Sequence, residues 1–180
     1  MNSKDLVPKM ISLLFLLPLL LGCTSAQPAP TATASPTPLP ATATPPVEAN
    51  QLIVTDTFEG VIFTREKAEA DQPVYQAEGY WTPTQTDILN LESALAPYLQ
   101  QAAPQDYPGP LKDLTDYKRQ YVGLLKDGRQ LIWVNFFCQA HQIDWQQEFV
   151  FIADGGSCYF ELNYNPQTGE FSDLSIHGES

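Results

Sequence analysis

The segment Cys138-x-x-His141-x-x-Asp144 combines the residue types with the widest chemistry in this chain. A thiolate, an imidazole and a carboxylate at this spacing could bind a metal ion or form a thiol–imidazole pair for nucleophilic catalysis. A zinc site needs about four ligands, and the chain has 2 histidines, the other being His177. A disulfide at Cys138 would also remove the thiolate. We therefore favour a polar connecting loop and expect no metal or other cofactor.

Two turn-like segments carry oxygen-rich patterns. In Asp154-Gly155-Gly156-Ser157 a serine follows two glycines, but the segment lacks the Gly-x-Ser-x-Gly pattern of a nucleophile elbow, so a hairpin turn is favoured. The second segment alternates oxygen ligands as a calcium loop does, although it holds no aspartate; its members are Asn163, Asn165, Gln167, Gly169 and Glu170. If the protein were an enzyme, acid–base chemistry would fall to His141, Asp144 or Glu161.

Large aromatic side chains form a third group of candidates, namely Trp81, Trp133, Trp145, Phe136 and Phe137. Adjacent residues of a strand point to opposite faces, so the Phe136-Phe137 pair places an aromatic ring on each face of one strand. One face could therefore line a pocket or a partner surface. Packing of these rings in the core is the favoured alternative.

Of the 3 cysteines, Cys138 and Cys158 lie in the C-terminal part of the chain. A pair of cysteines in an exported domain favours a disulfide, and two buried free thiols are the alternative. The bond requires Cα atoms within about 7 Å. In a plain meander, a strand at residues 148–153 would separate the two cysteines by about 20 Å.

The disulfide therefore has a consequence for the order of strands. We expect strand 157–164 to lie antiparallel beside strand 130–138, and residues 139–147 to cross back along the sheet. Such a bond would stabilise the fold by about 2–4 kcal/mol.

The N-terminal residues have the pattern of an export signal. An apolar run from Met10 to Leu21 ends in Leu20-Leu21-Gly22-Cys23. The run is too short to span a bilayer, which takes roughly 20 residues, and is typical of a signal-peptide core. The last four residues resemble the lipobox of bacterial lipoproteins. This resemblance implies that residues 1–22 are removed as a signal peptide and that Cys23 is acylated; an ordinary secretory signal or an uncleaved anchor are the alternatives.

The charge of the chain bears on its partners. A formal net charge of −12 would repel nucleic-acid phosphates and anionic lipid head groups. No nucleic acid is therefore expected as a partner, and attachment to a membrane would depend on acyl chains at Cys23. Two such chains hold a protein firmly, whereas a single chain binds only marginally.

Composition divides the mature chain into two parts. Residues 23–50 begin with this cysteine, consist mainly of Pro, Thr, Ala and Ser, and cannot bury enough apolar area to offset the entropy of ordering. They are expected to form a disordered linker that serves as an extended spacer. Residues 51–180 have the composition of a globular protein and are long enough for a single domain.

The expected elements of this domain are mostly strands. Short apolar runs at residues 52–54 and 61–63 suggest a first hairpin, and Tyr75 to Trp81 a further strand. Thr82 as N-cap, Pro83 and Gln85 predict a helix that extends to Gln101, with Pro97 as a local conflict. Strands are then expected at residues 119–125, 130–138, 148–153, 157–164 and 171–176, because turn signals such as Asp127-Gly128 separate them.

This order predicts an α+β fold in which one main helix packs on a curved, mostly antiparallel sheet. The outline resembles that of cystatin-like and NTF2-like domains. The Phe-Cys and Asp-Gly-Gly-x-Cys segments also resemble those of small secreted or lipid-anchored bacterial proteins, a resemblance that implies no activity. We expect a binding or structural domain of the cell envelope, anchored by lipid, with a protein or small-molecule ligand. A small enzyme or ligand carrier with a pocket in the curved sheet is the alternative.

Overall fold

The computed structural model of the protein describes residues 48–103 and 111–178. The expected signal peptide, the lipobox and nearly all of the expected linker lie outside the described residues. The elements follow the order of an α+β fold, as predicted. They are β1 (Gln51–Val54), β2 (Glu59–Ile62), α1 (Arg65–Asp71), β3 (Gly79–Trp81), α2 (Gln85–Ala102), the 3-10 turn η1 (Leu114–Asp116), β4 (Lys118–Lys126), β5 (Arg129–Phe137), the 3-10 turn η2 (Gly156–Cys158), β6 (Tyr159–Asn165) and β7 (Glu170–Ile176).

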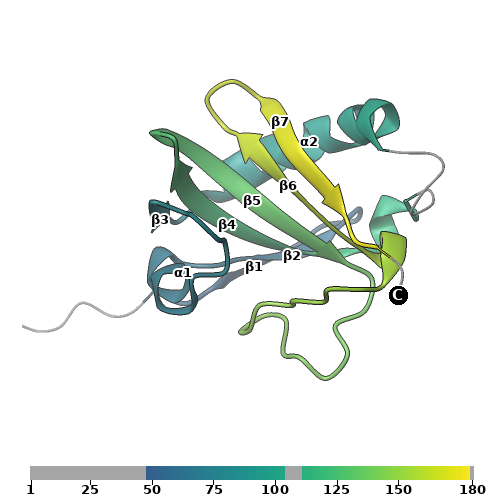
Figure 1. Ribbon diagram of the computed structural model, residues 1–180, viewed down its shortest axis with the longest axis horizontal. Helices are drawn as coiled ribbons and strands as arrows, with labels where there is room; N and C mark the ends of the chain where they lie inside the picture. The colour runs from purple at the N-terminus through teal and green to yellow at the C-terminus, as the bar shows by residue number, and fades with distance from the viewer. Residues whose placement is uncertain (1–47, 104–110, 179–180) are drawn as a thin grey trace, which may run out of the picture. The chain divides into compact units, whose positions relative to one another are not determined.

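Seven strands of the described part form one open, mostly antiparallel sheet in the order β1-β2-β4-β5-β6-β7, with β3 also paired to β4 (Figure 1). Strand β4 pairs with β5 along its whole length. Its other edge is shared by β2, which runs parallel to it, and β3, which runs antiparallel. The expected Asp127-Gly128 turn joins β4 to β5, and both residues have positive φ, as a tight hairpin requires.

Helix α2 covers one face of the sheet, called here the inner face. Its buried residues recur every three or four positions, so they form one apolar stripe; they are Ile88, Leu91, Leu95 and Leu99. The stripe packs on alternate residues of the strands, which include Tyr121, Val134, Phe136, Phe160 and Leu162. The predicted main helix packed on the sheet is therefore confirmed.

The start of α2 differs from the prediction. The N-cap is Thr84, whose side chain accepts the N–H of Asp87 while the Asp87 carboxylate accepts the N–H of Thr84, a reciprocal capping box. Thr82 is not the cap, because its hydroxyl accepts the backbone N–H of Arg65 at the start of α1. Pro97 lies inside α2 without ending it, on an exposed position of the helix.

Helix α1 was not among the predicted elements. Only Ala68 of this helix is buried, so it has no apolar periodicity to reveal it. Thr64 caps its first turn by accepting the N–H of Lys67. An ion pair between Lys67 and Asp71 at 2.8 Å supports it with i,i+4 spacing. Local polar interactions thus define this helix.

A long loop, residues 138–155 between β5 and η2, covers the opposite outer face of the sheet together with α1, whose Ala68 is buried there. We call this loop the outer-face loop. Phe149 of the loop packs on Phe63 with ring centroids 4.1 Å apart, and Trp145 packs on Phe137 at 5.9 Å. These rings belong to a second buried cluster together with Val150. The sheet is therefore covered on both faces, whereas the prediction placed only the main helix on it.

Two buried side-chain amides in the sheet bind this loop. Gln120 donates to the carbonyls of Trp145 at 2.8 Å and Glu148 at 2.7 Å, and accepts the N–H of Val150 at 3.0 Å. Asn135 donates to the Val150 carbonyl at 2.7 Å and to Gln120 at 3.1 Å. Buried backbone polar groups need such partners, so these two side chains supply the hydrogen bonds that a neighbouring strand would otherwise provide.

The predicted strand at residues 148–153 is wrong for this reason. Phe149 and Val150 are both buried and Phe151 is 58% exposed, so burial does not alternate from residue to residue as it would in a strand. The backbone of this segment bonds to side chains and lies over the sheet. Because no strand intervenes, β6 pairs antiparallel with β5, as the disulfide required.

Replacing Gly123 with alanine is expected to lower the free energy of unfolding by about 1–3 kcal/mol. Gly123 pairs with Trp81 across β3 and β4, and a Cβ atom there would come within 2.4 Å of the Trp81 carbonyl and 2.7 Å of its ring. Gly79→Ala is the matched control in the same pair of strands, since its Cβ would meet only Leu125 at 3.4 Å. Urea unfolding of both variants measures the difference, and equal stability would contradict the close approach of Trp81.

Candidate functional site

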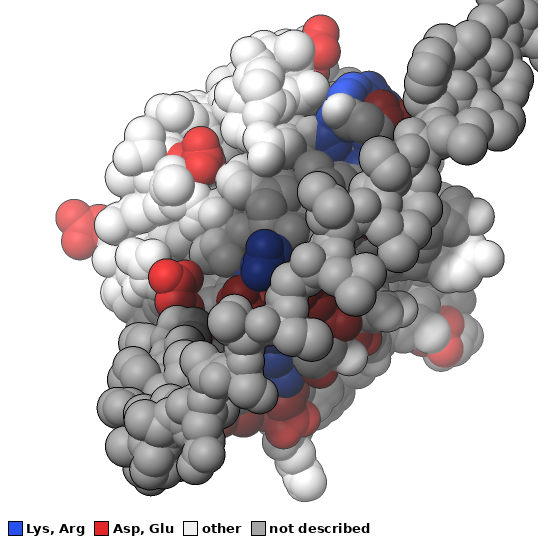
Figure 2. All heavy atoms as spheres, turned by 90° about the vertical axis from the view of Figure 1, so that its left-hand side faces the viewer, with Lys and Arg blue, Asp and Glu red and all other residues white. Residues whose placement is uncertain are grey.

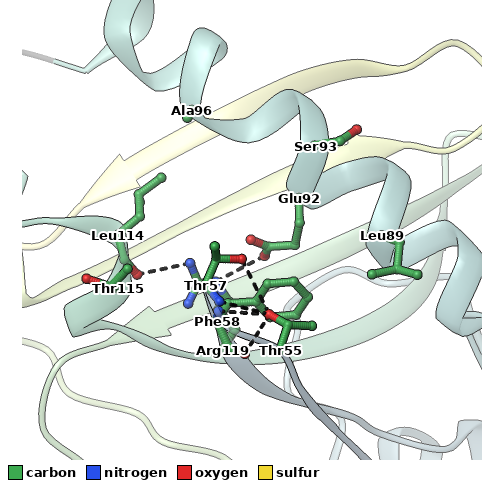
Figure 3. Close-up of a pocket in the computed structure, with 10 residues that line it drawn as sticks. All are labelled: Thr55, Thr57, Phe58, Leu89, Glu92, Ser93, Ala96, Leu114, Thr115 and Arg119. Atoms are coloured by element: carbon green, nitrogen blue, oxygen red, sulfur yellow. Dashed lines mark hydrogen bonds and ion pairs between the residues drawn. The ribbon is translucent and has the colours of Figure 1, made fainter.

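A pocket of about 430 Å³ opens between α2, the β1–β2 turn and η1 (Figure 3). Helix α2 contributes one wall and strand β4 the base. Its lining residues are Thr55, Thr57, Phe58, Leu89, Glu92, Ser93, Ala96, Leu114, Thr115 and Arg119. We call it the Glu92 pocket, because this carboxylate is the charged group that reaches it from α2.

At the base of the pocket, Arg119 of β4 is almost fully buried, with 1% of its side chain exposed. Its NH1 and NH2 groups donate to the carbonyls of Tyr117 at 2.7 Å and Leu114 at 3.0 Å. Its Nε lies 3.0 Å from Oε1 of Glu92. The guanidinium also lies over the ring of Phe58, 5.3 Å from its centroid. A buried cation requires such compensation. Two carbonyls, a carboxylate and a ring provide it here, although Nε itself makes no hydrogen bond with the described residues.

Glu92 is the partner of this cation. Its Oε1 also accepts the hydroxyl proton of Tyr121 at 2.7 Å. Burial raises the pKa of Glu92 above its ordinary value, and the charge of Arg119 and the Tyr121 hydrogen bond oppose this shift. Burial likewise raises the pKa of Tyr121, so this phenol is a hydrogen-bond donor and stays protonated near neutral pH.

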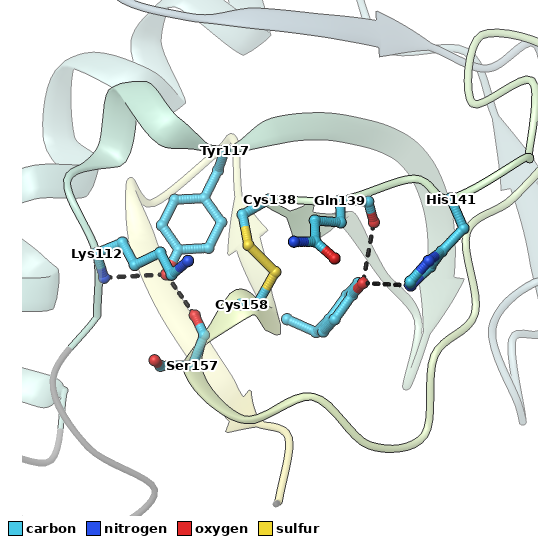
Figure 4. The surroundings of a disulfide bond; sticks show 8 residues. Lys112, Tyr117, Cys138, Gln139, His141, Ser157 and Cys158 are labelled. Atoms are coloured by element: carbon cyan, nitrogen blue, oxygen red, sulfur yellow. Dashed lines mark hydrogen bonds between the residues drawn. A yellow bond between two sulfur atoms is a disulfide. The ribbon is translucent and has the colours of Figure 1, made fainter.

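A second cluster surrounds the Cys138–Cys158 disulfide, which is present with Cα atoms 5.2 Å apart (Figure 4). The cysteines are also joined by a hydrogen bond from the N–H of Cys138 to the carbonyl of Cys158 at 3.0 Å. On one side, the hydroxyl of Tyr117 donates to the carbonyl of Ser157. These contacts fix the two ends of the outer-face loop beside each other.

The structure separates the residues of the Cys138-x-x-His141-x-x-Asp144 segment. The sulfur of Cys138 is in the disulfide, so it offers no thiolate. The Nε2 atom of His141 lies 3.1 Å from the hydroxyl of Tyr159, and Asp144 accepts the N–H of Gln146 in a turn. In residues 48–103 and 111–178, no three His, Cys, Asp or Glu side chains are grouped so as to hold a metal ion.

The other oxygen-bearing candidates also have local roles. Gly155 and Gly156 donate their N–H groups to the carbonyl of Gly178, and Ser157 lies in η2, so no strand–turn–helix elbow forms. The calcium-like residues do not converge: Asn165 accepts backbone N–H groups within its own turn, and Asn163 donates to Asp173. The turn that they form joins β6 to β7, as expected.

Glu161 and the aromatic candidates belong to the packing of the sheet. Glu161 accepts the indole N–H of Trp133 at 3.0 Å on the outer face. Trp81 donates its indole N–H to the carbonyls of Leu124 and Leu131. The other large rings, Trp133, Trp145, Phe136 and Phe137, are buried in the two core clusters. Core packing, the favoured interpretation of these aromatics, is confirmed.

Glu92, Arg119 and Tyr121 were not among the site residues predicted from the sequence. One available signal was Arg119 itself, since its spacing of two from Tyr117 and Tyr121 puts a charged residue on the same strand face as two aromatic residues. A charged residue at such a position needs a partner. The partner, on another element 27 positions away in the chain, could not be recognised from spacing.

No protein-family model, curated protein or solved structure shows a significant match to this chain. Within residues 48–103 and 111–178, none of the helices combines the length and the apolar character needed to cross a bilayer.

Proposed function

We propose that this protein is a bacterial lipoprotein, held on a membrane through Cys23, and that its folded domain binds a ligand outside the cytoplasm. The lipobox-like residues Leu20 to Cys23 support the anchor. The Cys138–Cys158 disulfide supports an oxidising, extracytoplasmic compartment, where such bonds form and persist. The disulfide is the single structural observation on which the cellular setting depends.

The distribution of charge supports anchoring by lipid. On the face shown in Figure 2, acidic side chains are spread over the visible surface, and the basic side chains have acidic atoms near them. Electrostatic attraction to anionic lipids needs clustered Lys or Arg residues. Hydrocarbon chains on Cys23 would hold an acidic protein at a bilayer without such a cluster.

The geometry favours binding over catalysis as the role of the domain. The acid–base candidates His141, Asp144 and Glu161 each contact a different part of the outer face. Aromatic and aliphatic side chains fill the space between α2 and the sheet, where the alternative function would place its pocket. The Glu92 pocket opens at the side of the helix and offers a defined polar group within apolar walls, which is the usual composition of a ligand site.

Native protein isolated from its host membranes is expected to carry fatty acids at Cys23. Mass spectrometry of the N-terminal peptide measures the mass added by the acyl groups. Triton X-114 partition measures whether the protein enters the detergent phase. Wild-type protein should enter the detergent phase, whereas Cys23→Ser should remain uncleaved and without acyl mass, because no thiol is present for lipid attachment.

The matched control is Cys138→Ser/Cys158→Ser, which also removes thiols but should keep the fatty acids. A wild-type N-terminal peptide with an unmodified cysteine would overturn the anchor, and so would a Cys23→Ser protein that still carries acyl groups.

A further inference from the structure

The hydroxyl groups at the Glu92 pocket already use their protons inside the protein. Ser93 donates to the carbonyl of Asn90 at 2.7 Å, and Thr115 donates to the Asp113 carboxylate at 2.8 Å. Thr55 donates to the carbonyl of Phe58 at 3.1 Å. A hydroxyl has one proton to donate and two lone pairs, so Ser93 and Thr115 offer a ligand acceptor sites. The lone pairs of Thr55 already accept the N–H groups of Phe58 at 3.0 Å and Thr57 at 3.3 Å.

Thr57 completes this set of hydroxyls. Its Oγ1 lies 3.4 Å from Oγ1 of Thr55. Since the proton of Thr55 is directed to Phe58, the proton shared between the two threonines comes from Thr57. None of the four hydroxyls therefore has a free O–H group, and those of Thr57, Ser93 and Thr115 have lone pairs for a ligand.

The ionic pair at the base adds a carboxylate acceptor. The guanidinium of Arg119 donates to two carbonyls and faces Glu92, and with 1% of its side chain exposed it offers a ligand almost no surface. Oε1 of Glu92 accepts the hydroxyl proton of Tyr121 and lies 3.0 Å from Nε of Arg119 in an ion pair. Oε2 of Glu92 has no hydrogen-bond partner among the described residues and is the polar atom left for a ligand.

The rest of the lining is apolar. Phe58, Leu89, Ala96 and Leu114 contribute hydrocarbon surface around the carboxylate (Figure 3). A ligand that suits this pocket has hydrogen-bond donors without acceptors at one end and a short apolar stem at the other. A primary ammonium group has three donors and no acceptor, and the net charge of −12 favours its approach.

We propose that the Glu92 pocket binds a small primary amine in its ammonium form, with the ammonium group on Oε2 of Glu92 and an alkyl or arylalkyl stem against Phe58 and Leu89. This inference rests on the proposed binding function and names the chemical class of its ligand. Glu92 accepts the charge-assisted hydrogen bond, the hydroxyls accept the remaining ammonium protons, and the apolar walls exclude water from the stem.

The test uses the full-length chain, ¹⁵N-labelled, titrated at pH 7 with n-hexylammonium chloride and observed by heteronuclear NMR. The amide signals of residues in α2 and η1 are expected to change chemical shift in a saturable way as the amine is added. Neutral 1-hexanol and anionic hexanoate have the same stem and serve as probes of the head group. Binding of the ammonium should be at least about tenfold tighter than that of the alcohol, because hydrogen bonds between charged groups are stronger than neutral ones. Equal binding of the three probes, or no saturable shift with the ammonium, would overturn the inference.

Two variants at position 89 test how much charge contributes to the binding of hexylammonium in this pocket. Leu89 is 45% exposed on α2, so polar substitutions there should leave the fold intact. Leu89→Lys adds an ammonium at the mouth of the pocket and should weaken hexylammonium binding about fivefold or more relative to Leu89→Gln, which has similar size and no charge. If the two variants bind hexylammonium equally, the probe does not occupy this pocket.

Glu92→Gln removes the charge at the base while it keeps the shape of the side chain. It should abolish the preference for hexylammonium over hexanol, and its thermal melt reports whether the fold survives. The lipid analysis of Cys23 does not depend on any of these titrations. Failure of hexylammonium to bind would therefore leave the anchor proposal standing, and absence of fatty acid would leave the pocket proposal standing.

Discussion

Replacement of Arg119 by methionine is expected to lower the free energy of unfolding by about 3–5 kcal/mol, the range for removal of one member of a buried ion pair. Glu92 would keep its buried carboxylate without the opposite charge that now lies 3.0 Å away. The carbonyls of Tyr117 and Leu114 would also lose their donors. Urea unfolding followed by circular dichroism gives the difference in free energy.

The pH dependence of the unfolding free energy of Arg119→Met tests whether the unpaired charge of Glu92 causes the loss of stability. Burial raises the folded-state pKa of Glu92 above its unfolded value, and the loss of Arg119 would raise it further. The folded state then binds the proton more tightly, so its stability falls as pH rises from the unfolded pKa to the folded pKa. The deficit of Arg119→Met should therefore be smallest below the unfolded pKa of Glu92 and largest above its folded pKa.

The double variant Arg119→Met/Glu92→Met provides the control. It removes both charges together, so it should recover much of the stability that Arg119→Met loses. A single variant within about 1 kcal/mol of wild type, or a double variant whose loss equals the sum of the two single losses, would show that the pair does not stabilise the fold in this way.

Removal of the disulfide is expected to cost about 3 kcal/mol of unfolding free energy, since the bond closes a loop across a sequence separation of 20. The change is Cys138→Ser/Cys158→Ser. Within the folded state, the outer-face loop should open more often because its two ends are no longer joined. Amide exchange of Val150, whose N–H is buried against Gln120, measures this opening.

Chemical reduction of the wild type distinguishes the effect of losing the disulfide from the effect of replacing two cysteines by serine. A reductant such as TCEP should lower the stability of wild type toward that of the double serine variant and should leave the variant itself unchanged. Gln120→Leu is a useful comparison, because it frees the same loop at its centre while the disulfide stays intact. Wild-type stability that is insensitive to complete reduction would contradict the proposed constraint.

The strands of the C-terminal half followed from local patterns. Alternating apolar residues and the Asp127-Gly128 turn predict β4 and β5, and both the pairing and the turn are present. The disulfide requirement placed β6 beside β5, which the register confirms. These features were predictable because turn chemistry and alternation act over a few residues, and because a disulfide imposes one short distance.

Other elements depended on interactions that local patterns do not contain. Residues 148–153 resemble a strand, but Gln120 and Asn135 supply their hydrogen bonds from the face of the sheet. Thr82 resembles a helix cap, but its hydroxyl binds the start of α1. In both cases the residue types are those of the predicted element, and a partner distant in the chain determines where the hydrogen bonds go.

The sequence by itself determined the α+β class, the main helix and the two C-terminal hairpins, because short-range hydrophobic periodicity and turn geometry encode them. The pairing of Cys138 with Cys158 was predicted from a different signal, a pair of cysteines in an exported domain. The lipid anchor at Cys23 remains a prediction from sequence. Only the tertiary structure decided that Arg119 and Glu92 meet. Their contact requires α2 to lie across the inner face so that one buried charge reaches the other, and this depends on packing between elements far apart in the chain.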